Sequence, residues 1–124
     1  MDTNISSEKG LEERIELSLL YDFYGALLKE NQKRMFEENI LEDYNFSEIA
    51  EEEGISRQGV HDSIKRAARQ LHAYEKKLGF VARYKKQREQ IMELQALLKT
   101  LPLPGDTEAL LSIQHILEAL MDEI

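Results

Sequence analysis

The stretch FSEIAEEEGISRQGVHDSIKR, residues 46–66, has the residue spacing of a helix-turn-helix motif. Such a motif uses a small residue where the second helix crosses the first, a turn residue that tolerates positive φ, and a branched apolar residue that fixes the crossing. Ala50, Gly54 and Val60 meet these needs in order, and Ser56 can cap the second helix. The register predicts a helix-turn-helix at about 46–66. A plain helical hairpin within a bundle is the alternative.

The outward residues at the start of the second helix would face a nucleic-acid groove. Arginine pairs with guanine and glutamine with adenine there, while basic residues further along the helix can hold phosphates. Gly59 offers no side chain for reading, and Asp62 repels phosphate unless it accepts from a cytosine amino group. The acidic run at 51–53 on the first helix also opposes phosphate. The candidate nucleic-acid-binding residues are Arg57, Gln58, His61, Asp62, Lys65, Arg66 and Arg69.

Charge is distributed unevenly along the chain. The formal net charge is −8, yet residues 55–88 hold ten basic and two acidic residues. Residues 1–54 hold 15 acidic and five basic residues, and residues 89–124 hold seven acidic and one basic. The middle segment is therefore predicted to attract a polyanion, while the flanking segments repel one. The alternative is that it is simply the solvated face of a helical protein.

Apolar residues at helical spacing precede the motif. Gly25 is expected to bend or end a first helix, and Asn31 to cap a second. The third helix is expected to begin near Ser47, capped by Ser47 itself or by Asn45, which has Glu48 at capping-box spacing. The residues expected to face inward are Leu11, Ile15, Leu19 and Phe23 with Leu20, Tyr21 and Tyr24 alongside on the first helix, and Met35, Phe36 and Ile40 on the second.

The apolar period continues after the motif in alternating steps of four and three, typical of a long helix that packs on another. We expect either one helix from Ser56 to about Lys99, or two helices hinged near Gly79 and Phe80. The two prolines beyond it force a break. The predicted inward positions are Val60, Ile64, Ala67, Leu71, Tyr74, Leu78 and Val81, then Tyr84, Arg88, Ile91, Leu94 or Gln95, and Leu98.

A last helix is expected to begin at a cap, Asp106 or Thr107. No alternating strand pattern is found, so the predicted fold class is all-α. We expect residues 1–78 to form a helical part that contains the helix-turn-helix, and residues 79–124 to form a helical hairpin. Its apolar seams exceed what the first part can cover, which predicts a homodimer; folding back through Pro102 and Pro104 is the alternative. The face expected on the last helix is Leu110, Ile113, Leu117, Leu120 and Ile124.

Several classes of function find no support in the sequence. The chain has no cysteine, and its three histidines have no metal-ligand spacing, so we expect no metal site and no cofactor. No signal peptide and no apolar run of about 20 residues is found, which predicts a cytoplasmic protein without membrane insertion. No phosphate loop, nucleophile motif or singled-out carboxylate pair is found, so we do not expect an enzyme.

The stretch LLKENQKRMFEENILEDYNFSEIAEEEGISRQGVHDSIKRAARQL resembles region 4 of sigma-70-type transcription factors. A longer stretch looks like the YlxM family of small bacterial proteins, through LYDFYGALL, EIAEEEGISRQGVHDSIKR and YEKKLGF. This resemblance covers about Leu11 to Leu98. It implies a sigma-70 region 4-like helix-turn-helix in a regulatory protein associated with the signal recognition particle pathway. The apolar period adds a long helix after the motif and a C-terminal helix. The stretch departs from the sigma pattern at His61-Asp62-Ser63, where sigma proteins tend to carry basic and amide residues.

Two functions are consistent with these features. In the first, the protein binds DNA or the RNA of the signal recognition particle through the recognition helix. In the second, it is a protein-interaction adaptor that keeps the helix-turn-helix as a scaffold without sequence-specific DNA reading. The acidic balance and Asp62 favour the second, whereas the basic segment favours the first.

Overall fold

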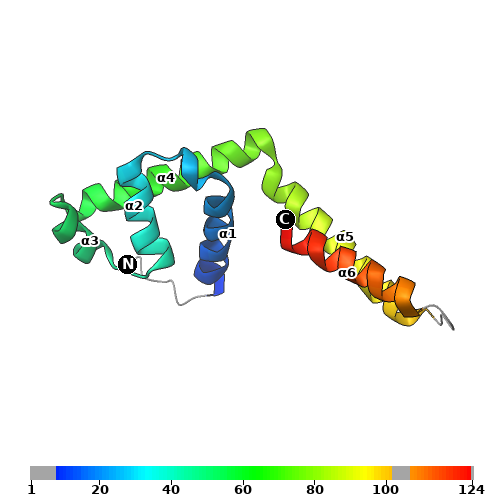
Figure 1. The fold of residues 1–124 in the computed structure, drawn as a ribbon. Coiled ribbons are helices and arrows are strands. Elements are labelled where there is room, and N and C mark those ends of the chain that lie inside the picture. The colour runs from blue at the N-terminus through cyan, green and yellow to red at the C-terminus, as the bar shows by residue number, and fades with distance from the viewer. Residues whose placement is uncertain (1–7, 102–106, 124) are drawn as a thin grey trace. The chain divides into compact units, whose positions relative to one another are not determined.

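The computed structural model describes residues 8–101 and 107–123 (Figure 1). These residues are helical, with no strand among them, which confirms the all-α prediction. The elements are α1 (Glu8–Tyr24), a 3-10 turn η2 (Gly25–Leu27), α2 (Glu30–Phe36), a π-helical segment η3 (Glu37–Leu41), α3 (Phe46–Glu53), α4 (Arg57–Leu78), α5 (Phe80–Thr100) and α6 (Thr107–Glu123). The chain divides into two compact units, Met1–Val81 and Ala82–Ile124.

The first unit is built around α4, which contacts α1, α2 and α3. Residues three and four apart on α4 point into one core because they lie on one face of the helix. Burial there removes apolar surface from water, the main favourable term in folding. The buried apolar residues of this core are Leu17, Leu20, Tyr24, Leu28, Met35, Phe36, Ile49, Ala50, Val60, Ile64, Ala67, Leu71 and Val81.

The face that α1 buries matches the prediction only in part. Leu20 and Tyr24 are buried as predicted, and Leu17 is buried although it was not predicted. Leu11 and Ile15 were predicted to face inward but are 55% and 60% exposed. Because α1 carries apolar side chains on both sides, spacing alone did not select the side that meets α4. The rest of the predicted set, Leu19, Phe23 and Tyr21, lies partly buried against the core. Gly25 ends α1 and begins the 3-10 turn, as predicted.

The start of α2 corrects a second prediction. Asn31 is not the cap, because α2 begins at Glu30 after the extended residue Lys29, which makes no side-chain cap hydrogen bond. Met35 and Phe36 are buried as expected, and Ile40 packs at the edge of the core from η3. The Phe36 ring stacks on Tyr21, with ring centroids 5.1 Å apart.

Arg14 on α1 holds the segment that leads into α3. Its guanidinium donates to the backbone carbonyls of Asn39 (3.2 Å) and Ile40 (2.8 Å) and pairs with Asp43. Helical segments end with unpaired carbonyls, and a cation near that end satisfies them and matches the helix dipole. Asp43 itself has a positive φ of 62°. The entry to the helix-turn-helix is thus tied to α1.

The long seam is interrupted at Gly79, so the two-helix alternative is the observed one. Gly79 ends α4 with φ 65°, a left-handed conformation that glycine adopts without a steric penalty. The Glu75 carboxylate accepts from the Tyr24 hydroxyl (2.6 Å) and from the Val81 N–H (3.0 Å). The change of direction at Gly79 leaves Leu78 43% exposed, contrary to the prediction that it faces inward.

The second unit comprises the rest of α5 together with α6. Its half-buried positions on α5 are Tyr84, Ile91, Gln95 and Leu98, whereas the predicted Arg88 and Leu94 are exposed. On α6 the covered face is Leu110, Gln114, Leu117 and Met121, so the prediction was wrong for Ile113 and Leu120, which are exposed. Of the two predicted caps, Thr107 begins α6 and Asp106 lies outside the described residues, as does Ile124.

Candidate nucleic-acid interface

The turn between α3 and α4 is shaped by local hydrogen bonds that the sequence encodes. Asn45 caps α3 and forms a capping box with Glu48: each side chain bonds the other residue's backbone N–H, at 2.8 and 2.9 Å. Gly54 ends α3 with φ 71°, and the Ile55 N–H returns to the Ala50 carbonyl at 3.2 Å. These bonds fix where α3 stops and where α4 can begin.

The start of α4 is equally well defined. The Ser56 hydroxyl accepts from the Gly59 N–H at 2.9 Å, so Ser56 is the predicted cap. A Cβ on Gly59 would lie 3.2 Å from that hydroxyl, so the cap itself favours a glycine there. Val60 is fully buried and Ala50 is 9% exposed at the contact between the two helices. All four predicted scaffold residues therefore stand in the positions that the motif requires.

The predicted contact residues lie on α4 and form three groups. Arg57 and His61 gather around Phe46 at the start of α3. The Arg57 guanidinium carbon lies 5.8 Å from the Phe46 ring centroid, a cation–π distance, and the His61 ring meets it edge-on at 5.6 Å. Phe46 was not among the predicted site residues, because the third helix was expected to begin only near Ser47, whereas α3 begins at Phe46. Its position one residue after a capping asparagine was the available signal.

Asp62 organises the second group. Its carboxylate accepts from the Gln58 side-chain amide at 2.9 Å, and the His61 ring nitrogen lies 3.4 Å away. These two contacts, Gln58 first, hold the pKa of Asp62 below its usual range. One N–H of the Gln58 amide and one ring nitrogen of His61 are therefore engaged within the helix. Gln58 and Asp62 are four residues apart, a spacing that brings side chains together on a helix and that could have predicted this contact.

Three further cations follow along the same helix. Lys65, Arg66 and Arg69 are exposed, and the described residues include no ion-pair partner for any of them. At about 100° per residue, Arg69 and Asp62 lie directly opposite the buried line of α4, with Lys65 and Arg66 on either side. A cationic strip of this kind suits contact with a phosphate backbone.

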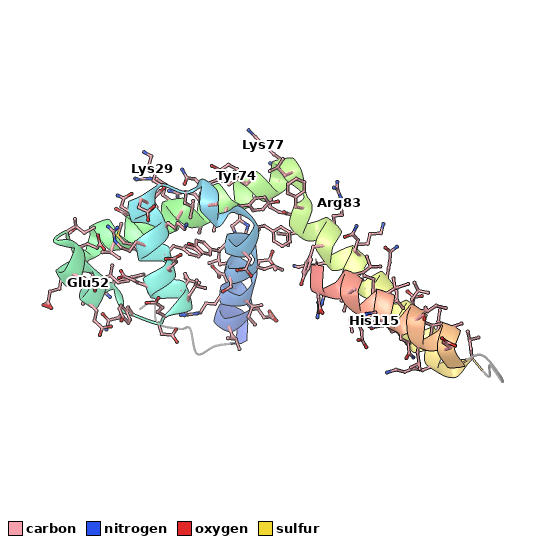
Figure 2. All side chains as sticks on the ribbon, viewed as in Figure 1. Lys29, Glu52, Tyr74, Lys77, Arg83 and His115 are labelled. Carbon is pink, nitrogen blue, oxygen red and sulfur yellow. The ribbon has the colours of Figure 1, made fainter. Side chains whose placement is uncertain are left out.

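The acidic run on α3 divides into two kinds of carboxylate. Glu53 is paired with Arg34 through two hydrogen bonds of 2.8 Å, which hold the pKa of its carboxyl below the usual range. Glu51 and Glu52 are exposed, and Figure 2 labels Glu52 on α3. Only part of the run therefore opposes phosphate, since one of the three charges is already neutralised.

Glu38 adds a buried carboxyl beside this run. It is 9% exposed, and its Oε1 has no hydrogen-bond partner among the described residues. Burial first, and then the nearby carboxylates of Glu52 and Glu53, raise the pKa of Glu38. Within the described part of the chain, no cluster of three or more metal-ligating side chains suits an ion, and no helix has the length and apolar character to cross a membrane.

Comparisons with known proteins agree with this architecture. The family described as "Putative helix-turn-helix protein, YlxM / p13 like" matches residues 11–102. A UPF0122 protein of Symbiobacterium thermophilum is 40% identical over 98 residues, covering 79% of this chain and 92% of the relative. One from Thermoanaerobacter sp. (strain X514) is 42% identical over 108 residues, covering 87% and 90%. One from Caldanaerobacter subterraneus is 47% identical over 78 residues, covering 63% and 67%. The chain therefore belongs to the YlxM/p13-like (UPF0122) family of helix-turn-helix proteins.

Proposed function

We propose that the chain is a small cytoplasmic regulatory protein that binds nucleic acid through the outward face of α4 and acts with the signal recognition particle. One observation carries the proposal: the helix-turn-helix presents Arg57, Lys65, Arg66 and Arg69 on the exposed side of one helix. Neutralising phosphates releases condensed counterions, and this release supplies most of the affinity of non-specific binding. The association with the particle rests on the family alone.

The geometry favours contact with the phosphate backbone over reading of base sequence. Asp62 engages one N–H of the Gln58 amide and one nitrogen of the His61 ring, which restricts how these two side chains can turn toward a base. Phosphate contacts position a protein on a helix without discriminating between sequences. We therefore expect modest sequence preference on duplex DNA, and RNA of the particle remains an equal candidate ligand.

A salt titration tests the proposal. The full chain is titrated with duplex DNA and with particle RNA at several salt concentrations, beside a variant that carries Lys65→Ala, Arg66→Ala and Arg69→Ala. Because each lost phosphate contact lowers the salt slope by about one, the variant should lose up to about three units of slope. Lys29→Ala, Lys33→Ala and Lys99→Ala together remove the same charge away from α4 and should leave the slope nearly unchanged. Equal losses in both variants, or no binding to either nucleic acid at low salt, would refute the proposal.

The adaptor function has an observation of its own in its favour. Asp62 occupies the middle of the α4 face and engages two of its reading residues, while Glu51 and Glu52 remain exposed beside it. In this alternative, the protein binds a protein component of the targeting machinery. Binding of the purified particle protein, measured with and without its RNA, should then survive the combined change Arg57→Ala, Gln58→Ala and Lys65→Ala. Loss of binding only when RNA is present would favour the nucleic-acid function.

A further inference from the structure

Both helices of the second unit carry two apolar faces, and only one face of each is covered. The covered positions are Ile91, Gln95 and Leu98 on α5 and Leu110, Gln114, Leu117 and Met121 on α6. A second set repeats at steps of three and four residues on each helix and stays 44–58% exposed. This second set is Leu94, Leu97 and Leu101 along α5 and just beyond its end, with Ile113, Ile116 and Leu120 on α6.

The two exposed sets fall on the same side of the unit. An α-helix has 3.6 residues per turn, so angles around its axis follow from residue numbers. On α5, Leu94 and Leu97 lie about a quarter-turn from the covered face. On α6, Ile113 and Ile116 lie slightly more than a quarter-turn from the covered face, in the same rotational sense. Figure 1 draws α6 running back along α5, and both helices belong to one compact unit. In an antiparallel pair, these two offsets point to the same side. We call this six-residue surface the hairpin patch.

The central line of the hairpin patch carries no charge. Gln87 and Gln90 continue this line on α5, and Ala109 continues it on α6. The line is bordered by Ser112 and Ala119 on α6 and by the acidic Glu93 on α5. In a two-fold contact, each group near the axis meets its own copy, so a charge there would face a like charge. A surface of small, apolar and uncharged polar residues avoids that repulsion and allows helices to approach closely.

We propose that the hairpin patch binds a second copy of this chain, so that two second units form a four-helix bundle. With about half of each side chain exposed, six of them on each of two copies supply about 1,000 Å² of buried surface, the lower bound for a specific interface. Helix pairs with a second apolar seam at three-and-four spacing are typical of such bundles. This inference does not depend on nucleic-acid binding.

The opposite side of the same hairpin offers a matched control. Met92 on α5 and Leu111 on α6 are 54% and 60% exposed, close to Leu97 and Ile116 at 57% and 58%. They lie about a quarter-turn to the other side of the covered faces. Leu97→Glu with Ile116→Glu therefore changes the hairpin patch, whereas Met92→Glu with Leu111→Glu makes the same chemical change outside it.

Sedimentation equilibrium of the full chain, over a range of micromolar concentrations, distinguishes the outcomes. We expect the unmodified protein and the Met92/Leu111 variant to have twice the mass of one chain. The Leu97/Ile116 variant should be monomeric at the same concentrations, with association weakened about 100-fold or more. Its far-UV circular dichroism should remain helical, because both substituted side chains are exposed within one copy. The proposal would be overturned if the unmodified protein were monomeric. It would also be overturned if the two variants weakened association equally. In either case the hairpin patch would not be the contact between two copies.

Discussion

The two units of this chain reach stability by different routes. The first contains the fully buried large side chains of the described residues, among them Tyr24, Phe36 and Leu71. In the described part of the second unit, only Leu117 is buried, and apolar side chains remain exposed on both helices. A helix pair has too few layers to close a core, whereas a helix surrounded by three others can do so. From this difference we expect the first unit to be stable by itself and the second to be stabilised by the proposed second copy.

The largest expected effect comes from the same substitution made in each unit. Leu71→Ala should lower the free energy of unfolding of the first unit by about 2–5 kcal/mol, because a fully buried leucine leaves a cavity. Leu117→Ala should reduce stability by about 2 kcal/mol, the low end of that range, because a hairpin can collapse around the gap. Urea denaturation followed by circular dichroism measures both.

Protein concentration separates the two units in that experiment. The Leu71→Ala shift should be independent of concentration, because the core of the first unit belongs to one chain. The unfolding midpoint of the second unit should fall on dilution, in the unmodified chain and in Leu117→Ala alike, because folding of that unit is then linked to association. A concentration dependence for Leu71→Ala, or none for Leu117→Ala, would remove the distinction between the units.

The junction at the end of the first unit should respond next. Glu75→Ala removes the acceptor for the buried Tyr24 hydroxyl and for the Val81 N–H, at a cost of about 1–3 kcal/mol. Tyr24→Phe keeps the ring and the bond from the Val81 N–H to Glu75, but it removes the hydroxyl that donates to Glu75 and accepts from the Phe80 N–H (3.2 Å). Its effect at the Val81 amide should therefore be smaller than that of Glu75→Ala. Hydrogen exchange at the Val81 amide reports the junction directly. Unchanged protection of that amide in Glu75→Ala would show that the carboxylate does not hold it.

A smaller and pH-dependent effect is expected at Glu38. Burial and neighbouring carboxylates raise the pKa of this carboxyl in the folded state, so the folded state binds its proton more tightly than the unfolded state does. The contribution of Glu38 to the free energy of unfolding is therefore fully present below its ordinary pKa. It is lost as the pH rises through the raised pKa of the folded state. Glu38→Gln keeps the neutral shape and should stabilise the protein by about 1 kcal/mol at pH 7, with little change at pH 4.

Thermal unfolding at the two pH values checks this sign. Glu51→Gln is the matched control, because it removes one charge from an exposed position on α3. Destabilisation of Glu38→Gln at pH 7 would mean that the ionised carboxylate has a favourable partner. Equal shifts in both variants would point to the net charge of the protein instead of to burial.

Local signals in the sequence predicted the fold well, whereas non-local pairings were harder to foresee. Gly54, Ser56 and the Asn45–Glu48 box act through neighbours within a few residues, so their roles followed from spacing. The side of α1 that is buried, and the pairing of Arg34 with Glu53, depend on how distant helices meet. Ile113 and Leu120 were wrongly predicted to face inward, because α6 carries apolar side chains on more than one face and spacing alone does not select the covered one. The candidate site shows the same division: its membership stays a prediction from spacing, and the contact between Gln58 and Asp62 that the structure shows was not foreseen.

The smallest effect expected is also the one that bears most on function. Asp62→Asn removes one negative charge from the α4 face but keeps an oxygen that can accept from the Gln58 amide. Stability should hardly change, because the side chain is exposed. Affinity for nucleic acid at low salt should rise several-fold, since a charge that repels phosphate is gone from among four cations. Asp62→Ala removes the charge and also frees Gln58 and His61. The variant protein should therefore bind nucleic acid more tightly and discriminate more between duplex sequences.

Equal sequence preference in the two variants would show that Asp62 acts through its charge alone. No gain of affinity in either variant would favour the adaptor function.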